Sequence, residues 1–169
     1  MKHDGITLGI DPGTARLGYG LIRGGLHPKL IDAGVIETWP DEPMPQRLVT
    51  LYESTVELIA EFHPDALAIE RLLFAQNVTT AIPVGQARGV VILAAAQANV
   101  PVAEYAPSEI KYAVAGYGKA DKPQMQEMVR MILNLSSVPK PDDAADALAV
   151  AICHAQSTPF VDRIHREPS

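Results

Sequence analysis

The 169-residue sequence contains one cysteine, Cys153, so no disulfide can form within the chain. Sparse cysteine is typical of a reducing compartment, and we expect a cytoplasmic protein. The first residues, MKHDGITLGI, lack the long apolar core of a signal peptide. Polar residues and a proline interrupt the apolar stretch over 89–103, which falls short of the ~20 apolar residues needed to span a bilayer. We therefore expect no membrane association.

The sequence also lacks an excess of basic residues. Its net charge is −6, which by itself argues against a nucleic-acid partner. The charge is unevenly distributed, however, because the segment 71–140 has seven Lys or Arg residues against four Asp or Glu, and the segments on either side are acidic. Chance variation among solvated faces and a basic surface in the middle of the chain are both consistent with this pattern.

Hydrophobic residues make up 47% of the chain, and its length suits one domain with a sizeable core. Apolar runs predict strands over 6–11, 17–24, 27–38, a segment ending at residue 70, and 100–106. Helical spacing of apolar residues predicts helices over 45–62, 79–98, 107–115, 122–133 and 142–157. The expected fold is an α/β domain over 1–157, a sheet of about five strands covered by helices, followed by a loose tail over 158–169.

Acidic residues stand where predicted strands end. Asp11 closes the first strand, and Glu70 closes the strand in ALAIE. Ligand sites in open α/β sheets gather beyond the carboxyl ends of strands, so adjacent parallel strands would bring these two acids together. In DDAADALA, Asp146 follows Asp143 by three residues and Asp142 by four, so either pair shares one helix face near the first turn. The small alanines between and after them would let this helix lie close to the sheet.

Each acid also has a purely structural interpretation. Asp11 could begin the turn that follows it, Glu70 could be an exposed strand end, and the helix acids could cap the helix or favour its dipole. Three acidic groups at one sheet edge, however, repel one another unless cations lie among them. Carboxylates without a His or Cys set suit Mg²⁺ or Mn²⁺, and two such ions about 4 Å apart stabilise the attacking and leaving oxygens of a phosphodiester displacement.

Five segments together resemble the RuvC family of Holliday-junction resolvases: LGIDPGTARLGYGLI, AIERLLFAQN, GQARGVVILAAA, YAPSEIKYAVAGYGKADKPQMQEMV and DDAADALAVAICHA. They run from Leu8 to His154 in unbroken order, which is most of the chain. GIDPGT alone also resembles the first phosphate loop of actin-like sugar kinases and chaperone ATPases, but those proteins need two such lobes and DDAADALA has no place in them. A junction-binding scaffold without chemistry is a third hypothesis, and the acids retained at the strand ends and the helix start argue against it.

The resemblance implies a ribonuclease-H-like mixed sheet and metal-dependent nicking of two opposed strands at a four-way DNA junction, during recombination and repair. It implies four catalytic, metal-binding carboxylates, which fall on Asp11, Glu70, Asp143 and Asp146. The implied cofactor is Mg²⁺, two ions per subunit, with Mn²⁺ as the alternative. Asp142 is an extra acid beside the expected pair and leaves the ligand assignment open by one residue.

The resemblance also implies DNA contacts. Lys111 and Lys122 would bind phosphates, although a solvated loop is an equal alternative. The aromatic residue that follows the strand-end glutamate in some members corresponds to Leu73 here, and Phe74 follows it. Either side chain could contact bases at the crossover, or both could fill the core.

A homodimer and the branch-migration proteins RuvA and RuvB are the partners that the resemblance implies. Ala81, Gly85 and Gly89 form a stripe of small residues at a spacing of four. This stripe could form a dimer interface, and packing on the sheet of the same domain is at least as good an interpretation.

Overall fold

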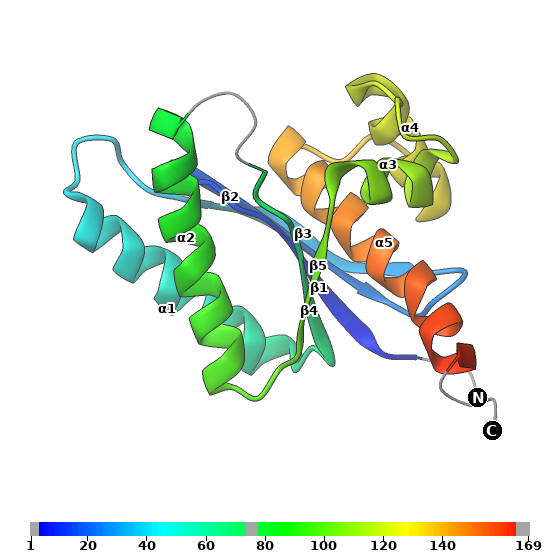
Figure 1. Cartoon of the computed structure of the whole chain (residues 1–169), viewed down its shortest axis with the longest axis horizontal. Helices are drawn as coiled ribbons and strands as arrows, with labels where there is room; N and C mark the ends of the chain where they lie inside the picture. Colours follow the sequence, from blue (N-terminus) through cyan, green and yellow to red (C-terminus); the bar gives the residue numbers. More distant parts are fainter. Residues whose placement is uncertain (1–3, 74–77, 165–169) are drawn as a thin grey trace.

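The computed structural model describes residues 4–73 and 78–164. Five strands form one mixed sheet in the order β3-β2-β1-β4-β5 (Figure 1). They are β1 (Ile6–Asp11), β2 (Arg16–Arg23), β3 (Lys29–Glu37), β4 (Ala66–Glu70) and β5 (Val102–Tyr105). The first three pair antiparallel, whereas β4 runs parallel to β1 and to β5. The parallel pairing of β1 with β4 is the arrangement that brings the two predicted strand-end acids to one edge.

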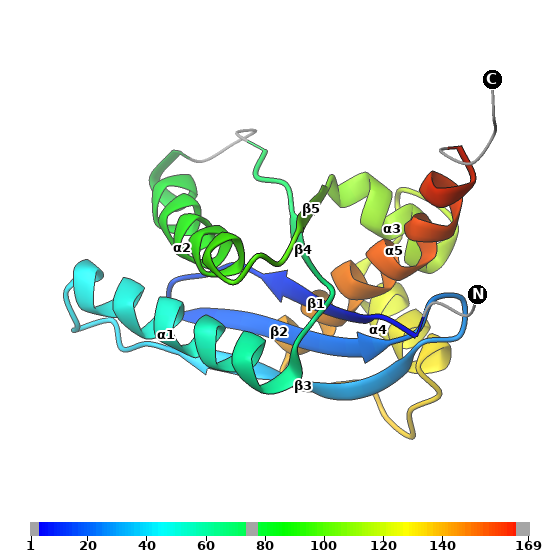
Figure 2. The ribbon, with the colours of Figure 1, turned by 90° about the horizontal axis from the view of Figure 1, so that it is seen from below.

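Helices cover both faces of the sheet (Figure 2). One face carries α1 (Met44–Phe62) and α2 (Val78–Gln97), and the other carries α3 (Pro107–Ala115), α4 (Lys122–Ile132) and α5 (Asp142–Ile164). Observed and predicted boundaries agree closely except at the end of α5, which continues past the predicted end at Ser157. Near that point the Ser157 hydroxyl donates to the Cys153 carbonyl, four residues earlier, at 2.7 Å.

The two faces of the sheet differ in residue size, and this difference places α5. Leu8 of β1 is fully buried in the core cluster that β1 forms with α1 and α2. Its neighbour Gly9 points to the opposite face, where a Cβ would lie 2.1 Å from the Ala147 carbonyl oxygen. A Cβ at Gly18 of β2 would lie 2.0 Å from the carbonyl oxygen of Asp143. Only glycine leaves room for this helix, so α5 lies with its backbone directly on β1 and β2.

The helix α2 packs on the larger-residue face. Its residues Ala87 and Val91 are fully buried in one cluster with Leu51 of α1 and Ile10 of β1. Within residues 4–73 and 78–164, α2 is also the one helix whose length and composition would let it cross a membrane. Its buried residues contact the sheet and α1, as those of a core helix do.

Candidate metal centre

Strand pairing sets two acids side by side at the edge of the sheet. The parallel register pairs Ile10 with Ile69, so the residues that follow, Asp11 and Glu70, end neighbouring strands. Side chains alternate along a strand, and Gly9, two residues before Asp11, contacts α5. Both acids therefore face the helix that carries the third acidic group.

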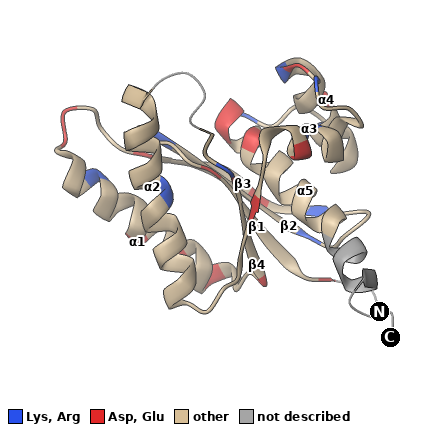
Figure 3. Cartoon of the chain, viewed as in Figure 1, with Lys and Arg blue, Asp and Glu red and all other residues tan. Residues whose placement is uncertain are grey.

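Three carboxylates meet at this edge. Asp11, Asp143 and Asp146 each offer an oxygen atom, and these atoms lie within 4.8 Å of one another. Asp143 and Asp146 come from the first turns of α5, and Figure 3 shows acidic residues at the start of this helix. Glu70 is not one of these three, but it lines the same groove of about 310 Å³ with Asp11 and Asp146. The structure thus brings all four predicted acids to one place, with Glu70 at the side of the cluster.

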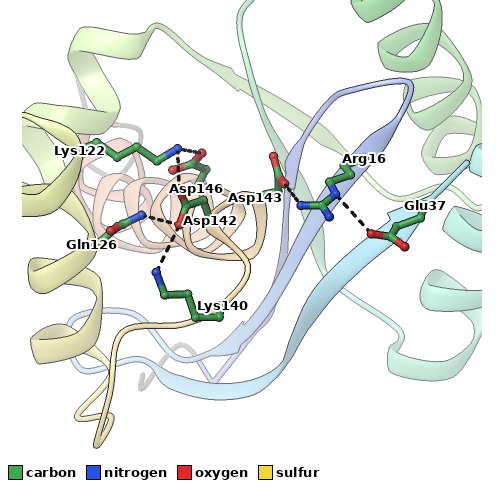
Figure 4. A network of polar contacts seen from close by, with 8 residues as sticks. All are labelled: Arg16, Glu37, Lys122, Gln126, Lys140, Asp142, Asp143 and Asp146. Atoms are coloured by element: carbon green, nitrogen blue, oxygen red, sulfur yellow. Dashed lines mark hydrogen bonds and ion pairs between the residues drawn. The ribbon is translucent and has the colours of Figure 1, made fainter. Parts of the chain in front are cut away.

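Asp142 belongs to a different set of contacts (Figure 4). Lys122 Nζ lies 3.3 Å from its Oδ2 atom, and Lys140 Nζ lies 3.6 Å from its Oδ1 atom. Gln126 donates a hydrogen bond of 3.0 Å from Nε2 to the same carboxylate. Asp143, on the next position of the helix, points to the other side. The geometry therefore favours Asp143 over Asp142 as the member of the cluster.

The cluster concentrates negative charge in a partly buried place. The pKa of Asp11 is raised to about 7, first by burial and then by the charges of Asp146, Asp143 and Glu70. Lys122 opposes this rise. Burial also raises the pKa of Asp146, against the opposing charge of Lys122. Because these pKa shifts disfavour ionised carboxylates, a cation bound among them would stabilise the cluster.

Both predicted lysines line the groove that holds the acids. Lys122, near the start of α4, places Nζ 3.6 Å from Oδ2 of Asp146, and its pKa is raised first by that charge. Burial, and then the charge of Asp146, raise the pKa of Glu70, and Lys111 on α3 opposes this rise. In this structure each lysine acts as a counter-charge to an acid of the site.

Leu73 lies beside the site and is exposed, with 55% of its surface accessible. It lines a second hollow, of about 250 Å³, together with Asp11 and Glu70. Leu73 therefore does not fill the core. Phe74, the other candidate for a contact with bases, lies outside the described residues.

Two arginines near the acids were not predicted from the sequence. Arg88 of α2 donates from Nε to the carbonyl oxygen of Glu70 at 3.2 Å, and its other end pairs with Glu104 at 2.7 Å. Arg88 therefore fixes the end of β4. The sequence signal that could have indicated this role is that Arg88 is the single charged residue in an apolar helix. Arg16, at the start of β2, lies between Glu37 and Asp143 (Figure 4).

Comparison with known proteins agrees with this arrangement. The family model described as crossover junction endodeoxyribonuclease RuvC matches residues 7–154. A protein of that name from Chloroflexus aggregans is 55% identical over 158 residues, which cover 93% of this chain and 96% of the relative. The chain belongs to the RuvC family. A further family member, from a Roseiflexus species, is 55% identical over 161 residues, covering 94% of this chain and 95% of the relative.

Solved structures show the same fold. Thermus thermophilus RuvC in complex with a Holliday junction substrate superimposes with a TM-score of 0.89 at 38% identity, covering 93% of this chain and 96% of that one. The yeast mitochondrial Holliday junction resolvase Ydc2 gives a TM-score of 0.67 at 17% identity, covering 93% and 80%, and supports the fold alone. The expected ribonuclease-H-like mixed sheet is confirmed.

Proposed function

We propose that this RuvC-family chain is a metal-dependent endodeoxyribonuclease that resolves four-way DNA junctions by paired nicks in opposite strands, in recombination and repair. The observation that carries the proposal is the cluster of Asp11, Asp143 and Asp146 at the carboxyl edge of β1. Fold likeness alone does not imply an activity, whereas carboxylates gathered in a groove next to basic residues fit phosphodiester chemistry.

The donor set fits a hard divalent cation, because it consists of carboxylate oxygens whose charges repel one another. We propose Mg²⁺, two ions per subunit, held by Asp11, Asp143 and Asp146 with Glu70 at the side. Bound Mg²⁺ would supply Lewis acidity that activates water and stabilises charge on the phosphate. Because the pKa of Asp11 is about 7 in the cation-free site, a proton would compete with a cation for this carboxylate at acidic pH.

The basic residues of the groove would hold the DNA strand. Lys122 contacts Asp146 and Asp142 in this structure, and we propose that it exchanges these contacts for a phosphate when cations neutralise the site. Lys111, on the neighbouring helix, lies along the same groove and would bind a second phosphate. Leu73 is exposed next to the acids and is suited to contact bases that open at the crossover.

Paired nicks need two sites related by the approximate two-fold symmetry of a four-way junction, so we propose a homodimer. The outer face of α2 is apolar, with Ile82 59% and Leu93 50% exposed on either side of Gly89. This surface supports the choice of α2 as the dimer interface. The family resemblance further leads us to propose RuvA and RuvB as partners.

The direct test is cleavage of a four-way junction whose arms carry separate labels, with Mg²⁺ and with linear duplex DNA of the same sequence as the control. We expect symmetric nicks in one pair of opposite strands and little cutting of the duplex. Equal cutting of both substrates, or no cutting of the junction with either Mg²⁺ or Mn²⁺, would overturn the proposed function. ATP hydrolysis, measured in parallel, is expected to be absent.

A further inference from the structure

Arg16 lies on the same side of the sheet as the acid cluster. Side chains alternate along β2, and Gly18, two residues after Arg16, contacts the carbonyl of Asp143. The antiparallel register pairs Arg16 with Glu37 of β3. Because Asp11 ends β1 opposite Gly18, Arg16 lies two residues beyond the end of that strand. The sheet therefore presents this arginine next to the carboxylates, at the edge where the groove opens.

The contacts of Arg16 hold it between two acids. Its Nε atom lies 3.3 Å from Oε1 of Glu37, and its NH1 atom lies 3.9 Å from Oδ2 of Asp143. The side chain is 55% exposed, and a pair at the limit of ion-pair distance between solvated groups adds little to folding stability. Folding stability therefore explains little of why Arg16 lies beside Asp143.

The positions of the basic residues around the cluster suggest a stronger reason. Lys111 and Lys122 line the groove on the side of α3 and α4. Arg16 lies on the opposite side, where Asp143 points toward β2 (Figure 4). A DNA strand with one phosphate over the carboxylates would place neighbouring phosphates on both sides. The guanidinium group can bind phosphate with two parallel N–H donors.

We propose that Arg16 binds a backbone phosphate of the DNA strand on the β2 side of the cluster, after exchanging its contact with Asp143 for that phosphate. This inference rests on the proposed function and adds a DNA-binding residue to it. A cation held by the cluster would neutralise Asp143 and so weaken the contact that draws Arg16 toward it. Arg16 would then keep its pair with Glu37 alone, and a backbone phosphate would replace Asp143 as its second partner.

Replacing Asp143 with a neutral residue removes the same charge without a metal ion. The proposal can therefore be tested by DNA binding alone, without cleavage. Junction affinity is measured in EDTA over a salt series for the wild type, Arg16→Gln, Asp143→Asn and the double variant. We expect Arg16→Gln to weaken binding several-fold and to lower the salt slope by up to about one unit. We also expect Asp143→Asn to tighten binding, with part of that gain lost in the double variant.

Two controls separate a DNA contact from damage to the site. Glu37→Gln keeps the arginine and should bind the junction at least as tightly as the wild type. Mn²⁺ binding to the DNA-free protein, followed by electron paramagnetic resonance, should hold or tighten in Arg16→Gln because a competing cation is lost.

Three results would overturn the proposal: an unchanged salt slope in Arg16→Gln, strict additivity with Asp143→Asn, or a fall in Mn²⁺ affinity that parallels the fall in junction affinity. Failure of the proposed function looks different. In that case the wild type shows no preference for the junction over linear duplex, whatever Arg16→Gln does.

Discussion

Replacing Asp11 with asparagine is expected to stabilise the metal-free protein. In the folded chain the Asp11 carboxyl is buried beside Asp146, Asp143 and Glu70, and its pKa rises from 3.8 to about 7. Asparagine has nearly the same shape and no charge, so it removes the repulsion and much of the cost of burying an ionised group. A residue kept for stability alone would give the opposite result.

The pH dependence follows from the direction of this shift. The folded chain holds the Asp11 proton up to about pH 7, whereas the unfolded chain releases it near 3.8, so wild-type stability falls as the pH rises between these values. The difference of about three pKa units corresponds to at most about 4 kcal/mol above pH 7. Between pH 5.5 and 8, the advantage of Asp11→Asn should grow by about 2 kcal/mol.

Urea unfolding in EDTA at pH 5.5 and pH 8 measures this change. In thermal unfolding, the difference in melting temperature between Asp11→Asn and the wild type should grow by roughly 4–8 °C between these two pH values for a chain of this size. Asp142→Asn is the matched control: Lys122 lowers the pKa of Asp142, so its neutralisation should bring no stabilisation. Added Mg²⁺ should then stabilise the wild type more than Asp11→Asn. If Asp11→Asn is less stable than the wild type at pH 8 in EDTA, Asp11 is a structural residue.

Three further variants test the surfaces around the site. Lys122→Ala should weaken junction binding and lower its salt slope by up to about one unit in fluorescence anisotropy, and an unchanged slope would make Lys122 only a counter-charge of Asp146. Leu73→Ala should reduce junction cutting and keep a melting temperature near that of the wild type, because the side chain is exposed; normal cutting by the folded variant would exclude its contact with DNA. Gly89→Glu should shift sedimentation toward the monomer, because it places a charge in the proposed interface. The variant should still fold, because among the described residues a Cβ there would meet nothing within 4 Å. A wild-type monomer that still makes paired cuts would refute the dimer.

Much of the fold was predictable because its signals are local. Apolar runs and helical spacing predicted the strands and helices, and the rule that sites lie beyond strand ends predicted Asp11 and Glu70. The small residues of α5 predicted its close approach to the sheet. Their partners, Gly9 and Gly18, were not predicted, because which glycines lie under a helix depends on strand pairing between distant segments.

The details of the site depended on packing that sequence spacing does not encode. Asp142 and Asp143 both lie in the first turn of α5, and only the rotation of that helix on the sheet directs Asp143 to the cluster and Asp142 to Lys122. Arg16 lies near Asp143 because β2 pairs with β3 and contacts α5. Arg88 reaches the end of β4 because α2 passes beside that strand. Each of these contacts joins segments that are far apart in the chain.

The central claim is that Asp11, Glu70, Asp143 and Asp146 bind metal for catalysis. The most direct measurement compares junction binding in EDTA with Mg²⁺-dependent nicking for the Asp→Asn and Glu→Gln variant of each, with Asp142→Asn as the control. We expect all four to fold, to bind the junction at least as tightly as the wild type because a repelling charge is gone, and to lose nicking by orders of magnitude. Asp142→Asn should nick almost normally. Wild-type nicking by all four variants, or an inactive Asp142→Asn beside an active Asp143→Asn, would contradict this account.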